Sequence, residues 1–186
     1  MATLTLANIV QNLNGAFQNR LQNTALYRLI YTYIYTDITA LESRTAVLEG
    51  SVVDCTASTL TVTAALHANR IVTLNRAAGI AVTLPAATGT GNVYTFVIGT
   101  TITSNTTTIT AAGSDKYQGY AIVFQDDAAA LGGWGAVAGT STVVTMDGTT
   151  RGGYAGDKIV FTDVASARWE VEITGKQTVT EATPFS

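Results

Sequence analysis

The sequence holds few side chains of the types that perform covalent catalysis. It has one histidine, His67, and one cysteine, Cys55, so a Ser-His-Asp or Cys-His site would have to use one of these two residues. Cys55 lies in the segment VVDCTAS, and no G-x-S-x-G nucleophile elbow is present. We therefore predict that His67 belongs to a turn between two strands, and we predict no catalytic residue.

The possible metal ligands are mostly aspartates. A zinc site needs several His and Cys ligands, and this sequence has too few. Calcium needs only oxygen ligands, for which the candidates are Asp126, Asp127, Asp147, Asp157 and Asp163. None of them lies in a D-x-[DN]-x-[DN]-G loop. Because aspartate readily accepts hydrogen bonds from its own backbone in turns, most are predicted to form turns, and no metal or other cofactor is expected.

Sugar and phosphate chemistry have equally little support. Acidic residues are sparse and mostly adjoin turns, so a pair of carboxylates for glycoside hydrolysis would form only through tertiary contact. The glycine-rich segments GTGNVY (89–94) and RGGYAGD (151–157) lack the Walker lysine and are predicted to be loops. Trp134 and Trp169 have two interpretations, stacking on a sugar ring or the commoner role of packing in a core or an interface.

The composition favours a chain that hides surface in an assembly. Of the 186 residues 47% are hydrophobic and only 12% are charged, against roughly 25% charged in average globular proteins. The most apolar stretch, 25–41, is interrupted by Arg28 and Asp37, which argues against a membrane span, and no signal peptide is expected. The net charge is −3 and no basic tract occurs, so nucleic acid is not expected as a partner.

The first fifty residues have a helical period. Apolar residues before residue 22 recur at steps of three and four, with polar residues between them: Leu6, Ile9, Val10, Leu13, Phe17 and Leu21. This spacing predicts a helix with one apolar face. Gly50 is a plausible end for the helical region.

A second periodic stretch runs from about residue 24 to residue 49. Residues seven apart form one row, Tyr27, Ile34, Leu41 and Leu48, and a second row follows four residues later, Tyr31, Ile38 and Thr45. As heptads these rows are d and a positions of a coiled coil. Two alternatives stay open, an amphipathic helix packed on the chain's own β domain, or a strand over the tyrosine-rich segment LYRLIYTYIYTDI.

After Gly50 the chain alternates apolar and polar residues in short runs separated by turn residues. The predicted strands are 60–64, 70–75, 80–85, 93–99, 106–113, 120–125, 134–139, 141–148, 157–164 and 168–175. This pattern predicts a mainly β fold, an antiparallel, jelly-roll-like β-sandwich, with Asp147-Gly148 as a hairpin signal. We therefore divide the chain into a helical attachment or oligomerisation segment, 1–50, and a β-sandwich domain, 51–186.

Two segments resemble known proteins. The segment RIVTLNRAAGIAVTLPAATGTGNVYTFVIG (70–99) resembles a pattern of bacteriophage virion proteins in which TLPAATG leads through a glycine loop to an aromatic strand. The segment GGYAGDKIVFTDVASARWEVEITG (152–175) and the terminal ATPFS (182–186) resemble further parts of the same proteins. The most similar group is the capsid decoration (cement) proteins, together with related head or tail fibre modules. Most of residues 70–186 share this resemblance, whose motifs are strand and turn patterns.

The resemblance implies a homotrimer on the outside of the capsid that clamps copies of the major capsid protein, with assembly in the host cytoplasm. In that role we predict the helical segment as the capsid contact or trimer seam, through Leu6, Ile9, Leu13, Phe17, Ile34, Ile38, Leu41 and Leu48. The threonine-rich strands are the alternative intersubunit surface. A tail fibre or receptor-binding protein that holds a host glycan is the second hypothesis, and fold alone does not separate it from decoration. A depolymerase is the weakest hypothesis, because the sequence lacks the residues for its chemistry.

Overall fold

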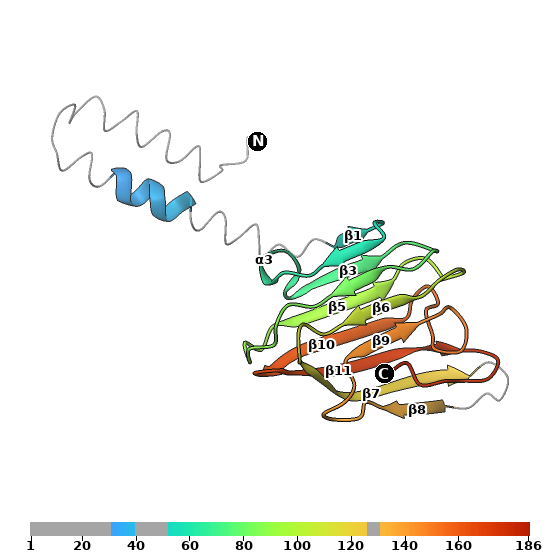
Figure 1. Cartoon of the computed structure of the whole chain (residues 1–186). Coiled ribbons are helices and arrows are strands. Elements are labelled where there is room, and N and C mark those ends of the chain that lie inside the picture. Colours follow the sequence, from blue (N-terminus) through green and yellow to red (C-terminus); the bar gives the residue numbers. More distant parts are fainter. Residues whose placement is uncertain (1–30, 40–51, 126–130) are drawn as a thin grey trace. The chain divides into compact units, whose positions relative to one another are not determined.

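The computed structural model describes residues 31–39, 52–125 and 131–186 (Figure 1). The chain divides into two compact units, Met1–Glu49 and Gly50–Ser186. In the first unit the described residues form a helix over 31–39. The second unit, called the β unit below, is built mainly of strands, and its β-rich character was predicted from the sequence.

The described strands of the β unit form two sheets. The seven-stranded sheet has the order β1-β3-β5-β10-β11-β7-β8, and the four-stranded sheet the order β2-β4-β6-β9 (Figure 1). The elements are β1 (Val53–Cys55), β2 (Thr59–Thr61), α3 (Ala64–His67), β3 (Arg70–Leu74), β4 (Ala81–Thr83), β5 (Val93–Ile98), β6 (Thr107–Thr110), β7 (Lys116–Gln125), β8 (Leu131–Gly135), β9 (Val143–Met146), β10 (Lys158–Ala165) and β11 (Arg168–Gln177).

The expected antiparallel order is wrong for the first half of the β unit. From β1 to β6 the chain alternates between the two sheets, so consecutive strands never pair with each other. Each strand therefore returns beside the strand two before it in the same direction, and β1–β3–β5 and β2–β4–β6 pair in parallel. This winding resembles that of a β-solenoid. Alternation of apolar and polar residues reports which face is buried and carries no information on strand direction.

The second half of the β unit mixes both directions. β10 pairs antiparallel with β5 and β11, whereas β11 and β7 pair in parallel from Arg168–Lys116 to Gln177–Gln125. Gly119 permits this close pairing, because its φ is +129° and a Cβ there would lie 2.0 Å from the carbonyl oxygen of Val171. β8 then closes the described order as an antiparallel edge strand beside β7.

One hydrophobic core lies between the sheets. It combines inward side chains of the larger sheet, such as Phe96 and Val171, with Val82 and Val144 of the smaller one. Trp169, fully buried, packs edge-on against Tyr94 and Phe161 at ring-centroid distances of 5.5 and 6.4 Å. The hydroxyl of Tyr117 donates a hydrogen bond of 3.0 Å to the carbonyl oxygen of Ile109 and so links the two sheets.

Asp147-Gly148 does not form the predicted hairpin. β9 pairs with β6 on one side, and on its other side the chain's last residues add short antiparallel pairing, with Phe185 opposite Val144. Ser186 exchanges backbone hydrogen bonds with Val143, and Phe185 is buried in the core. The turn signal at Asp147 was read correctly, but the strand that follows it in the sequence joins the other sheet.

Candidate interaction surface

The helix over residues 31–39 exposes apolar side chains. Tyr33, Ile34 and Tyr35 are 65%, 51% and 50% exposed, while Tyr31 and Ile38 are half-buried. Tyr31 and Tyr35, one turn apart, stack with their ring centroids 5.8 Å apart. Ile34 and Ile38 also lie one turn apart, and with Tyr31 they occupy the a and d positions of the predicted seam, with Tyr35 beside it. Of the predicted contact residues, Leu6, Ile9, Leu13, Phe17, Leu41 and Leu48 lie outside the described residues.

Two threonine hydroxyls of the helix are hydrogen-bonded to its own backbone. The hydroxyl of Thr36 donates to the carbonyl oxygen of Thr32 at 2.7 Å, and that of Thr39 donates to those of Tyr35 and Thr36. Threonines bonded in this way direct their hydroxyls toward the helix backbone. Asp37 is the one charged residue between Tyr31 and Thr39. A helix with so little polar surface is typical of helices that pack against a partner.

A second apolar surface lies on the outer face of the seven-stranded sheet. Tyr120, Ile122 and Phe124 alternate along β7 on the side away from the core, and Leu131 of β8 lies directly opposite Phe124. These four side chains, called the stripe below, are between 43% and 66% exposed. Groups of exposed apolar residues at this density commonly mark contact sites.

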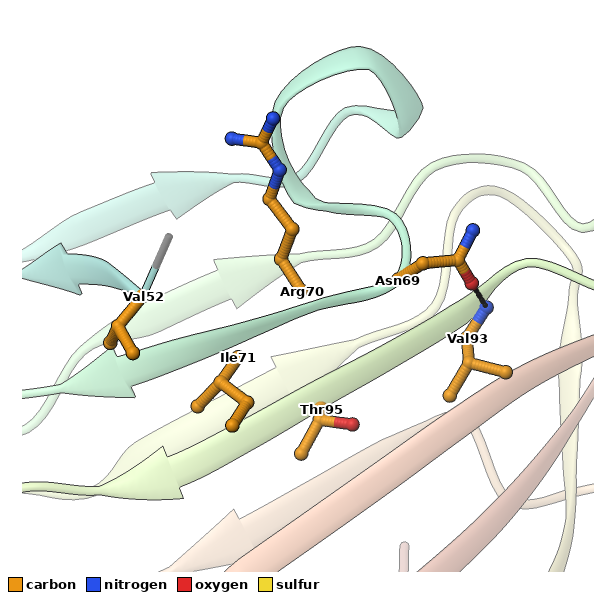
Figure 2. A pocket seen from close by; sticks show the side chains of 6 residues that line it. All are labelled: Val52, Asn69, Arg70, Ile71, Val93 and Thr95. Carbon is orange, nitrogen blue, oxygen red and sulfur yellow. Dashed lines mark hydrogen bonds between the residues drawn. The ribbon is translucent and has the colours of Figure 1, made fainter. Parts of the chain in front are cut away.

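A hollow of about 450 Å³ lies toward the other end of the same sheet (Figure 2). Its lining residues are Val52, Asn69, Arg70, Ile71, Val93 and Thr95. Figure 2 shows the side chains of Ile71 and Thr95 on one side of the sheet, while Arg70 points the opposite way. The side-chain oxygen of Asn69 accepts a hydrogen bond of 3.2 Å from the backbone N–H of Val93. β1 starts at Val53, opposite Val72, so it leaves Ile71 uncovered at this end of β3.

The strand registers place the hollow and the stripe on one continuous face. One row runs straight across the sheet from Ile71 through Thr95, Val160 and Glu172 to Tyr120. The next row runs from Thr73 through Val97, Lys158 and Thr174 to Ile122. β10 is the strand midway between β3 and β7, so Val160 lies at the centre of the face.

The carboxylate of Asp163 holds a loop of the β unit. It accepts hydrogen bonds from the backbone N–H groups of Thr88, Gly89 and Thr90 at 2.9, 2.6 and 3.0 Å, and from the Thr90 hydroxyl at 2.7 Å. Burial acts to raise the pKa of Asp163, but the hydrogen bonds from Thr90, Gly89 and Thr88 outweigh it and place the pKa below its usual value. This contact joins segments 70–99 and 152–175, which carry the sequence resemblance. The pairing of β5 with β10 joins the same two segments.

Asp147 and Asp157 have comparable structural roles. Asp147 accepts from the backbone N–H groups of Thr149 and Arg151 in its own turn, and these bonds with that of the Thr150 hydroxyl lower its pKa against the opposing effect of burial. Burial raises the pKa of Asp157, although Gly153, Tyr154 and Lys176 donate backbone hydrogen bonds to it. The prediction that most of these aspartates form turns is confirmed for Asp147. Asp157 likewise accepts hydrogen bonds within its own loop, from Gly153 and Tyr154. The turn prediction is wrong for Asp163, which lies inside β10 and holds a loop that is distant in the sequence. Asp126 and Asp127 lie outside the described residues.

His67 and the tryptophans are also engaged in the fold. His67 is buried in α3, between β2 and β3, and its Nδ1 accepts a hydrogen bond of 3.0 Å from the backbone N–H of Thr63. Cys55 is buried in β1. Trp169 is a core residue, and the half-buried Trp134 donates from Nε1 to the side-chain oxygen of Gln177 at 3.1 Å. Sugar stacking by Trp169 is therefore excluded.

Sequence reasoning missed both the stripe and the hollow. The signal for the stripe was present in YAIVFQ (120–125), because this segment is apolar at the core positions Ala121 and Val123 and also at the outward positions between them. A strand that is apolar on both faces is typical of a strand covered on both sides. The hollow has no local signal, since it depends on how far β1 extends beside β3.

Within residues 31–39, 52–125 and 131–186, no group of three or more His, Cys, Asp and Glu side chains is arranged to hold a metal ion, and no helix there has the length and apolarity to cross a membrane. No protein-family model, curated protein or solved structure matches the chain.

Proposed function

We propose that the chain is a virion structural protein, a capsid decoration protein that binds the outer surface of a capsid as a homotrimer and stabilises the shell. The observation that carries the proposal is exposed apolar surface on both units, on the helix over residues 31–39 and on the stripe of the β unit. Surfaces of this kind are stabilised by covering them, so they support a role in assembly.

The helix supports the oligomerisation part of the proposal. Tyr31, Ile34 and Ile38 have the spacing of a coiled-coil seam, and Ile34 and the neighbouring Tyr35 are half exposed within a single chain. Association of three such helices would cover them. The helical segment is therefore assigned to the trimer seam or the capsid contact, in a body of sandwich type with two sheets around one core.

The choice of a decoration role rests on the resemblance of 70–99 and 152–175 to virion proteins. The structure gives these segments a physical connection, because Asp163 of the second holds the Thr88–Thr90 loop of the first. A non-enzymatic role agrees with the engagement of Asp147, Asp157 and Asp163 in loop hydrogen bonds.

Cryo-electron microscopy of the particles that contain this chain tests the proposal. Density for threefold assemblies on the outer capsid surface, in a copy number that scales with the capsid subunits, is the expected result. Density confined to the tail would instead assign the chain to a fibre. A solution mass of the full chain equal to one copy, 19.4 kDa by light scattering, would contradict the trimer.

A further inference from the structure

We propose that strand β8 pairs edge to edge with β8 of a second copy, antiparallel and about a twofold axis that passes through Gly133. The contact goes beyond the decoration role, because it joins two β units and requires neither a capsid nor the helix over residues 31–39. It rests on the free hydrogen-bonding groups of β8, on its glycines and on the match of the strand with itself.

In the described part of the chain β8 is the unprotected sheet edge. It ends the seven-stranded order, beside β7 (Figure 1). The edge strands β1 and β2 have only three residues each, and the outer edge of β9 bonds to the backbone of 184–186. β8 has five residues, LGGWG, without charge or proline, and its register with β7 is unbroken. Natural proteins seldom leave such an edge uncovered.

Alternate backbone groups of β8 point away from β7. The N–H of Ala136 donates to the carbonyl oxygen of Gly119 at 2.9 Å, and in the unbroken antiparallel register every second residue before Ala136 bonds to β7 in the same way. The N–H and C=O groups of the intervening residues, Leu131, Gly133 and Gly135, therefore point to the free edge. Among the described strands only β7 pairs with β8.

Two glycines of β8 are not required by the fold of a single chain. Neither Gly133 nor Gly135 has a left-handed φ. A Cβ at Gly135 would have nothing within 4 Å, and one at Gly133 would meet only the carbonyl oxygen of Ala121, at 3.8 Å. Gly132 differs, since a Cβ there would lie 3.0 Å from Nε2 of Gln125. Glycine weakens a strand and often marks the close approach of another backbone, so Gly133 and Gly135 leave room for a strand from outside the chain.

The strand is complementary to itself in the register that joins its free groups. Antiparallel pairing centred on Gly133 sets Leu131 of each copy opposite Gly135 of the other, and each of the three outward-facing pairs exchanges two backbone hydrogen bonds. The same register sets Trp134 opposite Gly132 on the core-facing side. Each large side chain of β8 therefore faces a glycine of the other copy.

This register also joins the stripes of the two copies. Tyr120 lies opposite Gly135, so the outer face beside this tyrosine has no side chain on β8. Leu131 of the second copy fills that position, and Phe124 of the second copy lies opposite this leucine on the far side. The exposed apolar side chains then form one band across four strands. This continuity argues for a second copy, and not an unrelated strand, as the occupant.

Single cysteines in the full chain, in a Cys55→Ala background, test the register. A paired edge of five residues is smaller than the roughly 800 Å² per partner of a standard interface, so covalent trapping is the suitable assay. Gly133→Cys lies on the proposed axis, where paired Cα atoms are about 5.5 Å apart, a separation that a disulfide spans. We expect it to form a covalent dimer on its own under mild oxidation, detected on a non-reducing gel.

Leu131→Cys and Gly135→Cys should each give little dimer alone, because like positions lie about 13 Å apart along the paired strands. The two variants should cross-link when mixed. Ala81→Cys is the matched control, since it is exposed on β4 of the other sheet and should not cross-link.

Two further variants separate the contact from the fold. Gly133→Pro removes an N–H that faces the free edge and does not bond to β7. Added to both Leu131→Cys and Gly135→Cys, it should lower the yield of the mixed dimer at least tenfold. Gly135→Lys has open space within one chain but blocks Leu131 of the second copy, so it should lower the yield of the Gly133→Cys dimer at least tenfold. Unchanged circular dichroism melting curves show that the fold is intact.

Failure of Gly133→Cys to cross-link above the Ala81→Cys control would overturn the proposal. Equal yields from Gly133→Cys and from Leu131→Cys alone would indicate collisions without a register and would also overturn it, as would cross-linking that persists with Gly135→Lys. Incorporation into capsids is measured separately. A chain that cross-links but is not incorporated refutes only the decoration role, and a chain that is incorporated but does not cross-link refutes only the β8 contact.

Discussion

The helix over residues 31–39 and the core of the β unit place their aromatic side chains in opposite environments. Tyr33 and Tyr35 of the helix are 65% and 50% exposed. By contrast, Tyr94, Tyr117 and Trp169 of the β unit are buried in its hydrophobic core. The core of the β unit thus covers these large side chains within one chain, whereas Tyr120 and Phe124 of the stripe stay exposed. The described residues of the helix give Tyr33 and Tyr35 no comparable cover.

The hydrogen bonds of polar side chains also differ between the two regions. In the β unit the carboxylates of Asp157 and Asp163 each accept several backbone hydrogen bonds and thereby fix loops between strands. In the helix the hydroxyls of Thr36 and Thr39 donate hydrogen bonds to carbonyl oxygens of the preceding turn. Internal hydrogen bonding therefore strengthens the fold of one region and prepares the surface of the other for contact.

Truncation of Trp169 should have the largest effect on stability. Trp169→Ala removes a fully buried indole that packs on Tyr94 and Phe161, so we expect the free energy of unfolding to fall by about 3–5 kcal/mol. Urea denaturation followed by circular dichroism measures this. Tyr33→Ala, on the exposed helix, should change it by less than about 0.5 kcal/mol. Equal losses for both variants would remove the contrast between the two regions.

Loss of the Asp163 carboxylate should have the next largest effect. Asp163→Ala leaves the backbone N–H groups of Thr88, Gly89 and Thr90 without their acceptor, and we expect a loss of about 3 kcal/mol in the free energy of unfolding. Asp54→Ala is the control, because Asp54 is exposed and accepts from the Thr73 hydroxyl. The control should lose less than about 1 kcal/mol, and a similar loss in both would refute the assigned role of Asp163.

The pH dependence of stability gives a smaller, more specific signal from Asp163. Its pKa is lower in the folded chain than in the unfolded chain, where it is about 3.9. The stabilisation is therefore complete above that pH and declines as the pH falls through the folded value. The difference in unfolding free energy between the natural chain and Asp163→Asn should shrink on acidification from about pH 5.

The raised pKa of Asp157 acts with the opposite sign, since its protonated form is favoured by folding and that contribution is lost as the pH rises. Asp157 is present in both the natural chain and Asp163→Asn, so its effect cancels in the difference. A difference that stays constant over the acid range would show that the Asp163 carboxylate does not titrate as the loop geometry requires.

The strands could be predicted from the sequence because burial on one face leaves a period of two. Segments such as 93–99 and 168–175 correspond to β5 and β11 within two residues. The pairing of these strands could not be predicted from the sequence. β11 pairs with β7, for example, although the chain passes through the other sheet between these two strands. The same non-local order made Asp147-Gly148 a turn without a hairpin.

The candidate surface was predictable only in part. The heptad spacing identified Ile34 and Ile38, which lie on the helix that the structure describes. The stripe could have been predicted from the segment 120–124, which is apolar at its inward and its outward positions. The hollow is a consequence of unequal strand lengths and was beyond any local pattern.

The smallest effect on unfolding is expected from the helix, where the readout is association instead. The double variant Ile34→Ser with Ile38→Ser removes two aliphatic side chains of the seam and should leave the unfolding of the β unit within about 0.5 kcal/mol of the natural chain. Light scattering should report a shift from the oligomer toward the mass of a single copy, 19.4 kDa. Asp37→Ser is the matched control, since it makes a similar change in helix propensity on the same element without touching the seam. If the double variant keeps the mass of the oligomer, the helix is not an association surface. If it destabilises the β unit as much as Trp169→Ala does, the helix and the β unit do not differ as their exposed and buried aromatic residues indicate.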